Sequence, residues 1–326
     1  MTGGRLRIAV IGAGNHSALH HGNALQLYAT AHPGEIELAA VCDLDAAKAG
    51  AYARQFGFSR AYGDYHEMIA AEQLDGLITV TPPGITAALA ADLLVRGIPL
   101  AIEKPPAESA SGTRRLLELA RKHGAPHMVS FNRRYIPAVV KAREWLAGPL
   151  KGRAPLLVTA RMLRPARREK NFVTGTGIHL IDTVLSFMAE PRRVFTRRAP
   201  TGHEHRFLYA SLLECADGAG AAVVISPDVG TEEETVEIHG REYCIQIDTI
   251  RSRIRVVDGE QETLSWQPTG DAAYAFTCGA LGETEAFIRS IREGKGFWPD
   301  LETSLLTMTI AEAIEAGGEG PVDLGL

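Results

Sequence analysis

The sequence has few cysteines, no long hydrophobic run and no large excess of charge. Its four cysteines (Cys42, Cys215, Cys244 and Cys278) lie far apart and form no C-x-x-C pair. We therefore expect reduced, mostly packed thiols rather than a disulfide framework. No apolar stretch approaches the length of a membrane span. The formal charge of -5 gives no reason to expect nucleic acid or an anionic membrane as a partner.

What is present is the composition of an ordinary globular protein. The 326 residues are 45% hydrophobic and 22% charged, and a chain of this length is long enough for two domains. The chain passes almost directly from its N-terminus into a predicted strand, which leaves no room for a signal sequence. A cytoplasmic protein is the expectation.

Strand and helix patterns alternate through the first part of the chain. Apolar runs such as Leu6–Ile11 and Ile36–Cys42 predict buried strands, and Asp45 is placed to cap the helix Ala46–Phe56. This alternation predicts an α/β fold with a doubly wound parallel sheet over residues 1–130. Beyond it, consecutive strand patterns predict an α+β domain with a mostly antiparallel open sheet over residues 131–326.

A Gly-x-Gly loop lies between the first predicted strand and the first predicted helix. Glycine at Gly12 and Gly14 permits a tight turn and lets backbone N–H groups approach a pyrophosphate at the helix N-terminus. The third glycine position of this fingerprint holds Ser17, so we expect looser packing of the helix on the sheet. The setting predicts a dinucleotide-binding Rossmann domain.

The second predicted strand ends at Asp43, where a carboxylate can accept hydrogen bonds from the ribose hydroxyls of an adenosine. A 2′-phosphate would be repelled there, and Leu44 offers no positive charge in compensation. NAD is therefore favoured over NADP, which stays the alternative. Asp43 could instead be a simple turn residue, but Asp45 fits that role better.

Glu103, Lys104 and Pro105 follow an apolar run that predicts another buried strand. Open α/β sheets bind ligands at the carboxyl ends of their strands, and the proline restricts the lysine to extended conformations. A lysine at a strand end is usually only a solvated charge. The nucleotide loop earlier in the chain favours a role at a cofactor.

Three histidines, His16, His20 and His21, crowd the first predicted helix. Such a group suggests a metal site, but a solvated or packed role is the favoured interpretation, and no metal is predicted.

The order of motifs along nearly the whole chain resembles the glucose-fructose oxidoreductase / inositol dehydrogenase / MocA (Gfo/Idh/MocA) family of nicotinamide-dependent dehydrogenases. The motifs are Gly12-Ala13-Gly14, Thr81-Pro82-Pro83, Glu103-Lys104-Pro105, Asn132-x-Arg134-Tyr135 and Gly177-x-His179-x-x-Asp182.

This resemblance implies a set of site residues. Lys104 would contact cofactor and reacting hydroxyl, its bond to Pro105 is often cis in the family, and His179 would transfer the proton. The implied cofactor-binding residues are Gly12, Ala13, Gly14, Asn15, His16, Asp43, Thr81, Pro82, Glu103 and Lys104. Substrate-binding candidates are Arg134, Asp182 and Arg164.

Chemistry agrees with these roles, because neutral imidazole can take a hydroxyl proton near pH 7 and a cation stabilises the forming alkoxide. Packing offers an alternative for His179, which lies on an amphipathic helix where a packed histidine is common. Asp182, one turn on, could orient the imidazole or satisfy the local backbone.

Two positions depart from the family pattern. Many members place an aspartate four residues before the histidine, where this chain has Gly175, and a histidine after Thr-Pro-Pro, where it has Thr86. Either His179 moves the proton alone, or another side chain substitutes, or the reaction differs.

A basic run precedes the histidine motif and contains Arg161, Arg164, Arg167, Arg168 and Lys170. It could recognise a carboxylated or phosphorylated substrate. A solvated or subunit-contact loop is the favoured interpretation.

Together these features predict an NAD(P)-dependent oxidoreductase acting on a secondary alcohol, or the matching ketone, of a sugar, polyol or inositol-like substrate. A glycoside-cleaving enzyme that retains its NAD and a non-catalytic nucleotide-binding sensor are the alternatives. As in the resembled family, the second sheet is expected to form a homodimer or homotetramer.

Overall fold

The computed structural model describes residues 4–318 and 321–324. Contacts divide the chain into two compact units. Unit 1 runs to Asn132 and includes Gly279–Leu305, and unit 2 comprises Arg133–Cys278 and the residues from Leu306 onward. Gly279–Leu305, expected in the second domain, pack in unit 1 because α10 (Ala280–Glu293) lies against α2 (Asn23–Ala31).

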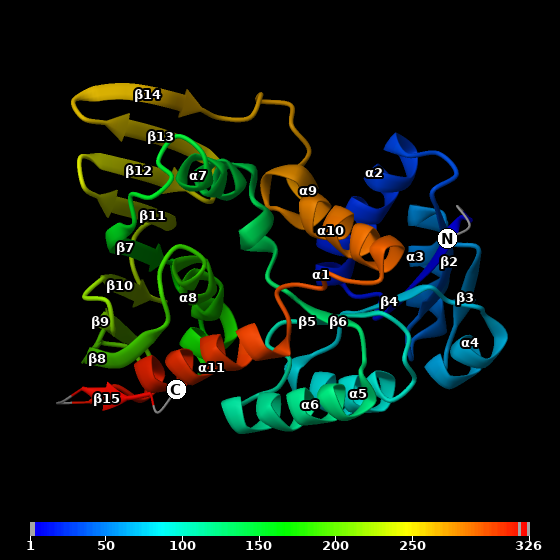
Figure 1. The fold of residues 1–326 in the computed structure, drawn as a ribbon. Helices are drawn as coiled ribbons and strands as arrows, with labels where there is room; N and C mark the ends of the chain where they lie inside the picture. Colours follow the sequence, from blue (N-terminus) through cyan, green and yellow to red (C-terminus); the bar gives the residue numbers. More distant parts are fainter. Residues whose placement is uncertain (1–3, 319–320, 325–326) are drawn as a thin grey trace. The chain divides into compact units, whose positions relative to one another are not determined.

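Within the described residues, unit 1 is built on a six-stranded parallel sheet with the order β3-β2-β1-β4-β5-β6. The order reverses at β1 and β4, so ligands are expected at the carboxyl ends of those strands. Buried Ile, Val, Leu and Ala side chains fill the strands because helices cover both faces (Figure 1). The strands are β1 (Leu6–Ile11), β2 (Ile36–Cys42), β3 (Arg60–Tyr62), β4 (Gly76–Thr79), β5 (Leu100–Glu103) and β6 (His127–Ser130).

The helices of unit 1 begin close to where their capping residues predict. The Asp45 carboxylate accepts hydrogen bonds from the backbone of Ala47 and Lys48, which confirms its predicted cap. Helices α5 and α6 pack together on the face opposite α2 and α10 (Figure 1). The remaining bounds are α1 (Asn15–Ser17), a π-helical turn η1 (Ala18–Gly22), α3 (Ala46–Phe56), α4 (Tyr65–Ala71), α5 (Pro83–Leu94) and α6 (Ala110–His123).

Unit 2 contains a nine-stranded sheet, counted over the described residues, with the order β14-β13-β12-β11-β7-β10-β9-β8-β15. All of its pairings are antiparallel except that of β7 with β10. The strands are β7 (Pro155–Leu163), β8 (Pro191–Pro200), β9 (Phe207–Cys215), β10 (Gly220–Ser226), β11 (Glu233–Gly240), β12 (Tyr243–Asp248), β13 (Arg253–Asp258), β14 (Gln261–Trp266) and β15 (Val322–Asp323).

One face of this sheet packs against helices (Figure 1). Val139, Ile181 and Ile310, each from a different helix, join Val223 and Ile245 of the strands in a single buried core. The alternate strand residues point to the other face, as the period of two requires. The helical elements are η2 (Asn132–Tyr135), α7 (Pro137–Ala147), the π turn η3 (Val173–Gly177), α8 (Ile178–Leu185), α9 (Tyr274–Thr277) and α11 (Leu301–Ala316).

The structure bears on two expectations from the sequence, reduced cysteines and the lack of a membrane-spanning segment. Within the described residues no disulfide links the four cysteines, and Cys42 and Cys215 are buried. Across residues 4–318 and 321–324, no helix combines the length and apolar character needed to cross a bilayer.

Candidate active site

The predicted cofactor-binding residues of unit 1 gather at one edge of its sheet. Gly12 follows β1, Asp43 follows β2, Thr81 follows β4 and Lys104 follows β5. These four strands are adjacent and parallel in the order β2-β1-β4-β5, so their carboxyl ends lie side by side. The edge includes the point where the strand order reverses, which is where such sheets bind nucleotides.

The Gly-x-Gly loop runs too close to the end of β4 for a side chain at its first glycine. Gly12 has φ +107°, and a Cβ there would lie 2.0 Å from the carbonyl oxygen of Val80. Its N–H donates to the carbonyl oxygen of Cys42 at 2.7 Å. The glycine is therefore required by the turn itself.

The second glycine of the loop, Gly14, has open space around it. A Cβ on Gly14 would meet no atom within 4 Å, and no side chain of the described chain caps the helix that begins at Asn15. The first N–H groups of a helix lack partners within the helix and favour anions. An uncapped helix start beside an open glycine fits the pyrophosphate of a dinucleotide.

Asp43 is bound to this loop. Its Oδ2 accepts a hydrogen bond from the backbone N–H of Ala13 at 2.8 Å, and its Oδ1 accepts one from Asp45 at 2.9 Å. The following Leu44 is 92% exposed. The carboxylate thus links the ends of β1 and β2, beside a side chain that supplies no positive charge.

Glu103 ends β5 as a buried carboxylate between two histidines. Nε2 of His21 lies 3.1 Å from its Oε2, and Nε2 of His16 lies 3.5 Å from its Oε1. Burial raises the pKa of the Glu103 carboxyl, but hydrogen bonds from both histidines and the charges of His21 and Lys104 outweigh burial, so its pKa lies below the ordinary value. Glu103 is therefore ionised at neutral pH, directly before Lys104.

Two further polar groups lie near these strand ends, and the sequence analysis did not propose Ser130 as a site residue. Ser130, the β6 residue paired in register with Glu103, has a buried hydroxyl that finds no hydrogen-bond partner within the described part of the chain. Thr86 donates to the backbone carbonyl of Thr81 at 3.0 Å. Thr86 therefore holds the turn that follows β4. The peptide bond between Lys104 and Pro105 is cis.

In unit 2, His179 is the second residue of α8 and is 5% exposed. Its backbone carbonyl accepts a hydrogen bond from Thr183 one turn later at 2.8 Å. The π turn η3 leads into this helix and contains Gly175. A Cβ on Gly175 would meet no atom within 4 Å, so a larger residue would fit at that position.

Arg134 and Asp182, two predicted substrate-binding candidates, bind each other. Nε of Arg134 donates to Oδ2 of Asp182 at 2.7 Å and Nη2 donates to Oδ1 at 2.8 Å. Thr307 donates to the same Oδ1 at 3.4 Å. The expectation that Asp182 orients His179 or satisfies the local backbone stays a prediction. The guanidinium of Arg134, which the sequence analysis did not connect with Asp182, holds the carboxylate.

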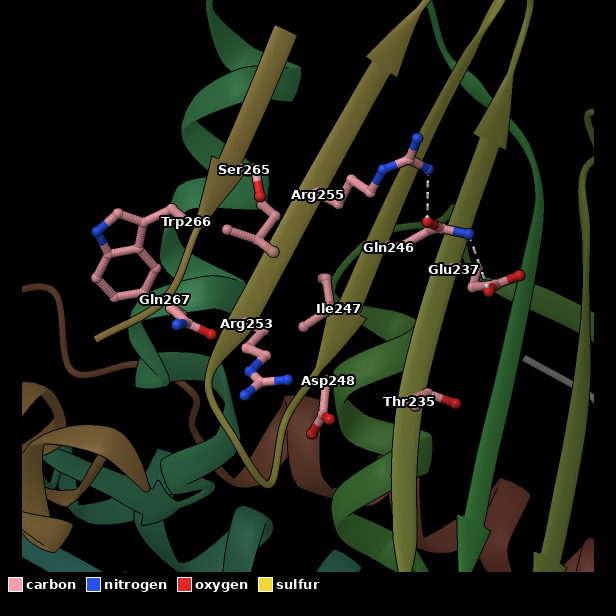
Figure 2. A pocket seen from close by; sticks show the side chains of 11 residues that line it. Thr235, Glu237, Gln246, Ile247, Asp248, Arg253, Arg255, Ser265, Trp266 and Gln267 are labelled. Carbon is pink, nitrogen blue, oxygen red and sulfur yellow. Dashed lines mark hydrogen bonds between the residues drawn. The ribbon is translucent and has the colours of Figure 1, made fainter. Parts of the chain in front are cut away.

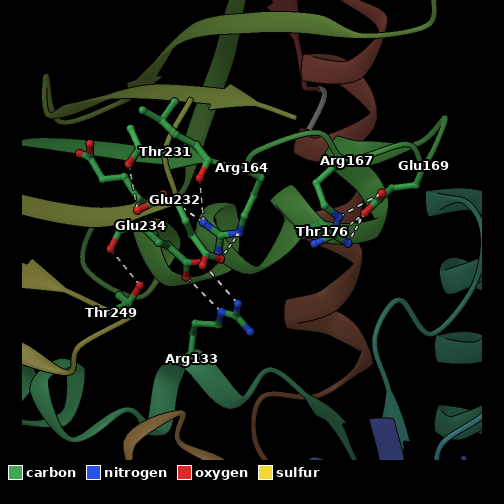
Figure 3. A network of polar contacts seen from close by, with 11 residues as sticks. Arg133, Arg164, Arg167, Glu169, Thr176, Thr231, Glu232, Glu234 and Thr249 are labelled. Atoms are coloured by element: carbon green, nitrogen blue, oxygen red, sulfur yellow. Dashed lines mark hydrogen bonds and ion pairs between the residues drawn. The ribbon is translucent and has the colours of Figure 1, made fainter. Parts of the chain in front are cut away.

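Arg164 is also buried, which makes the solvated-loop interpretation wrong for this residue. Figure 3 shows its guanidinium beside the carboxylate of Glu234, and Nη1 also donates to the carbonyl of Glu233 at 3.0 Å. Arg133 approaches Glu234 from the other side, Nε to Oε1 at 3.0 Å. Arg167 is exposed and forms an ion pair with Glu169, two residues later.

The histidine cluster gives no indication of a metal. Within the described residues, no group of three or more His, Cys, Asp or Glu side chains could hold a metal ion. His20 faces a different environment from its neighbours: burial and the charge of His16 lower its pKa to about 4. His20 is therefore neutral near pH 7.

The fold and this edge define a nicotinamide-dependent oxidoreductase, and comparison with known proteins agrees. The model of the oxidoreductase family with an NAD-binding Rossmann fold, GFO_IDH_MocA, matches residues 6–131. Residues 6–131 thus match the Gfo/Idh/MocA oxidoreductase model, and curated relatives that include MocA and an inositol 2-dehydrogenase support this family. These findings confirm the predicted fold class and the predicted use of NAD. They also confirm the predicted enzyme class, an NAD(P)-dependent dehydrogenase.

Curated relatives match over nearly the full length. The rhizopine catabolism protein MocA of Rhizobium meliloti is 25% identical over 95% of this chain and 94% of its own length. An inositol 2-dehydrogenase of Paracoccus denitrificans is 28% identical over 96% and 95%. Among solved structures, a levoglucosan dehydrogenase in complex with NADH has a TM-score of 0.83 at 20% identity, over 98% of this chain and 99% of that one. This last likeness bears on the fold alone.

Proposed function

We propose that this protein transfers a hydride between a nicotinamide and a secondary alcohol, or the matching ketone, of a sugar, polyol or inositol-like substrate. The observation that carries the proposal is the edge of the unit 1 sheet where the carboxyl ends of its strands meet. There the buried Glu103 ends β5 and Lys104 follows it, while the Gly-x-Gly loop follows β1, which is separated from β5 by β4 alone. The names of the near-full-length relatives support this substrate class.

The roles of the two catalytic residues follow from the chemistry of alcohol oxidation. When bound, the nicotinamide accepts the hydride. The Lys104 ammonium is proposed to polarise the hydroxyl and stabilise the alkoxide, because a cation near a developing negative charge lowers the barrier. His179 is proposed to take the hydroxyl proton at a ring nitrogen. In the direction of reduction, the same residue returns the proton.

The unit 1 edge supports the proposed cofactor contacts. Backbone N–H groups of Gly14, Asn15 and His16 would hold the pyrophosphate, and Asp43 the adenosine ribose. Ala13, Thr81 and Pro82 complete the proposed lining. The Asp43 carboxylate is followed by the exposed, uncharged Leu44, which favours NAD over NADP because a 2′-phosphate would be repelled.

Arg134, Asp182 and Arg164 are proposed to support the substrate site rather than to bind substrate through their charges. Each is at most 5% exposed, and each charge meets an opposite charge. Breaking such a pair to bind a ligand would leave a buried charge uncompensated.

A nucleotide titration followed by a substrate screen tests the function. Purified protein is titrated with NADH and NADPH by fluorescence, then offered sugars, polyols and inositols with NAD at the absorbance of reduced nicotinamide. We expect reduction with at least one substrate. Lys104→Ala should lower kcat on the order of a hundredfold and keep nucleotide binding, and His179→Asn should behave alike.

Other outcomes of the same screen would replace the proposal. Glycoside cleavage without net formation of NADH, with cofactor that co-purifies, would identify the NAD-retaining lyase-type reaction. Tight NADH binding with no reduction by any compound would indicate a sensor. Unchanged turnover in Lys104→Ala would remove that residue from the mechanism.

We propose a homodimer or homotetramer assembled through the sheet face of unit 2 that points away from its helices. Leu157, Phe195 and Leu212 are each at least 41% exposed, and the last two are partners in register. Part of the same sheet is a polar hollow, where Gln246 lies between Arg255 and Glu237 (Figure 2). Light scattering of wild type and Leu212→Glu, with Leu44→Glu as the control, tests this: only Leu212→Glu should reduce the mass.

A further inference from the structure

The first helix of unit 1 contains a π-helical turn between two α-helical segments. Asn15–Ser17 is α-helical, Ala18–Gly22 is the π turn, and Asn23–Ala31 continues as α-helix. An α-helix places residues three and four apart on one face, and a π turn widens this spacing to five. His16 and His21 are five positions apart, and the turn brings both imidazoles to Glu103.

Each histidine approaches a different oxygen of the Glu103 carboxylate. Nε2 of His21 lies 3.1 Å from Oε2, while Nε2 of His16 lies 3.5 Å from Oε1. The His21 side chain is 6% exposed and that of His16 is 51% exposed. The contact of His21 with Glu103 is therefore the shorter one and is buried, whereas the contact of His16 is longer and exposed to solvent.

Two contacts with α3 fix the rotation of this helix, one at the residue before the π turn and one at the last residue of the turn. The Ser17 hydroxyl lies 2.9 Å from the hydroxyl of Tyr52. A Cβ on Gly22 would lie 2.6 Å from the ring of Phe56, so the backbone there is in close contact with that ring. With both ends held, His21 has one orientation toward Glu103.

The carboxylate of Glu103 accepts hydrogen bonds only, so Nε2 of His21 carries the hydrogen. Without such a donor, a buried ionised carboxylate is costly and would turn toward other partners. Lys104 is the next residue, and its charge already acts on Glu103. The orientation of the Glu103 carboxylate therefore affects the position of the Lys104 ammonium.

We propose that His21 is a positioning residue that acts through Glu103 to hold Lys104 for the reaction. This positioning role rests on the proposed function, because it assumes that Lys104 acts at the reacting hydroxyl. His21 touches neither substrate nor cofactor in this proposal. Its contribution is an N–H donor at a fixed place, which an amide can replace and a hydrocarbon cannot.

The test compares three variants by kcat, KM, NADH affinity and melting temperature. His21→Leu removes the donor and His21→Gln keeps an N–H donor. His20→Gln alters the neighbouring histidine, whose Nδ1 lies 3.2 Å from the carbonyl oxygen of His16. We expect His21→Leu to lose about tenfold or more in kcat with NADH affinity nearly unchanged. His21→Gln should recover most of that loss, and His20→Gln should resemble wild type.

A second measurement does not depend on activity. Lys104 is labelled by reductive methylation with ¹³C-formaldehyde, and its titration is followed by NMR in wild type, His21→Leu and His21→Gln. We expect a lower Lys104 pKa in His21→Leu, because a misdirected carboxylate stabilises the ammonium less, and a wild-type value in His21→Gln.

These measurements separate the two proposals. A Lys104 titration that shifts in His21→Leu while no alcohol is oxidised would overturn the proposed function and keep the positioning role. Wild-type kcat and an unshifted Lys104 in His21→Leu would overturn the positioning role. So would a correctly folded His21→Gln that is as impaired as His21→Leu.

Discussion

Arg134 and Asp182 form a bidentate ion pair in the interior of unit 2, with Nε–Oδ2 and Nη2–Oδ1 distances of 2.7 and 2.8 Å. Their side chains are 2% and 0% exposed. Burial raises the pKa of the Asp182 carboxyl, and the charge and hydrogen bonds of Arg134 oppose that rise. Since Asp182 lies one turn after His179 on α8, this pair helps to fix the helix that carries the proposed proton-transfer residue.

Removing one partner of this pair should destabilise the protein strongly. Asp182→Asn leaves the Arg134 guanidinium buried without its counter-charge, which typically costs about 3–5 kcal/mol. Urea unfolding followed by circular dichroism measures the loss. The double variant Arg134→Met/Asp182→Leu is the control, and it should be more stable than Asp182→Asn because neither charge remains. Wild-type stability of Asp182→Asn would show that the pair contributes little.

Glu234 should make unit 2 sensitive to acid. Burial raises the pKa of its carboxyl, but the charges and hydrogen bonds of Arg133 and Arg164 outweigh burial and lower that pKa from 4.5 to about 2. A depressed carboxyl pKa contributes stability that is complete above the unfolded value and is lost as pH falls from about 4.5 toward 2. The shift corresponds to about 3 kcal/mol.

The measurement is the free energy of unfolding between pH 7 and pH 2 for wild type and Glu234→Gln. The variant should be less stable at pH 7, and its stability should fall less between pH 4.5 and 2. Arg164→Ala should lower the melting temperature, whereas Arg167→Ala, on the exposed neighbour, should not. Parallel pH profiles for wild type and Glu234→Gln would contradict the assignment.

The two glycines of the nucleotide loop should respond differently to alanine. Gly12→Ala forces a Cβ to within 2.0 Å of the Val80 carbonyl and a strained backbone at φ +107°, so we expect loss of folding stability as well as binding. Gly14→Ala meets open space and should melt like wild type while binding NADH about tenfold or more weakly, a loss of about 1.4 kcal/mol. Unaltered NADH affinity in Gly14→Ala would move the pyrophosphate away from this loop.

Local patterns were sufficient to predict most of the nucleotide-binding fold. Leu6–Ile11, Ile36–Cys42 and Ala46–Phe56 have the bounds expected for them, because period, capping and apolar runs are local properties. The strand β8 was missed, since its arginines obscure the alternation of buried and exposed side chains. The short β3, with no fully buried residue, gives no apolar run to detect.

The pairs that shape the site could not be predicted in the same way. Arg134 and Asp182 are 48 residues apart, and His21 and Glu103 are 82 residues apart. Sequence shows that a charge exists but not which buried charge it meets. The π turn of the first helix is likewise a tertiary effect, because nothing in its composition distinguishes it from α-helix.

Asp43 and Leu44 should control the choice between NAD and NADP. The double change Asp43→Ala/Leu44→Arg removes a negative charge and adds a guanidinium at an exposed position, which suits a 2′-phosphate. We expect NADPH affinity to rise about tenfold or more relative to NADH affinity, measured by fluorescence titration. Leu44→Arg alone is the matched control and should shift the ratio less. An unchanged ratio in the double variant would place the ribose elsewhere.

Gly175 stands where the family pattern described in the sequence analysis has an aspartate, and the structure leaves room for one. A Cβ there meets no atom within 4 Å, so Gly175→Asp should fold normally. A carboxylate four residues before His179, within the π turn that leads into α8, would stabilise the imidazolium formed when the ring takes a proton. With an alcohol found in the screen, we expect kcat to rise about tenfold. Gly175→Asn has the same shape without the charge and should leave kcat nearly unchanged. Equal rates for the two variants would mean that His179 already transfers the proton without a carboxylate, and that the glycine reflects a different substrate shape.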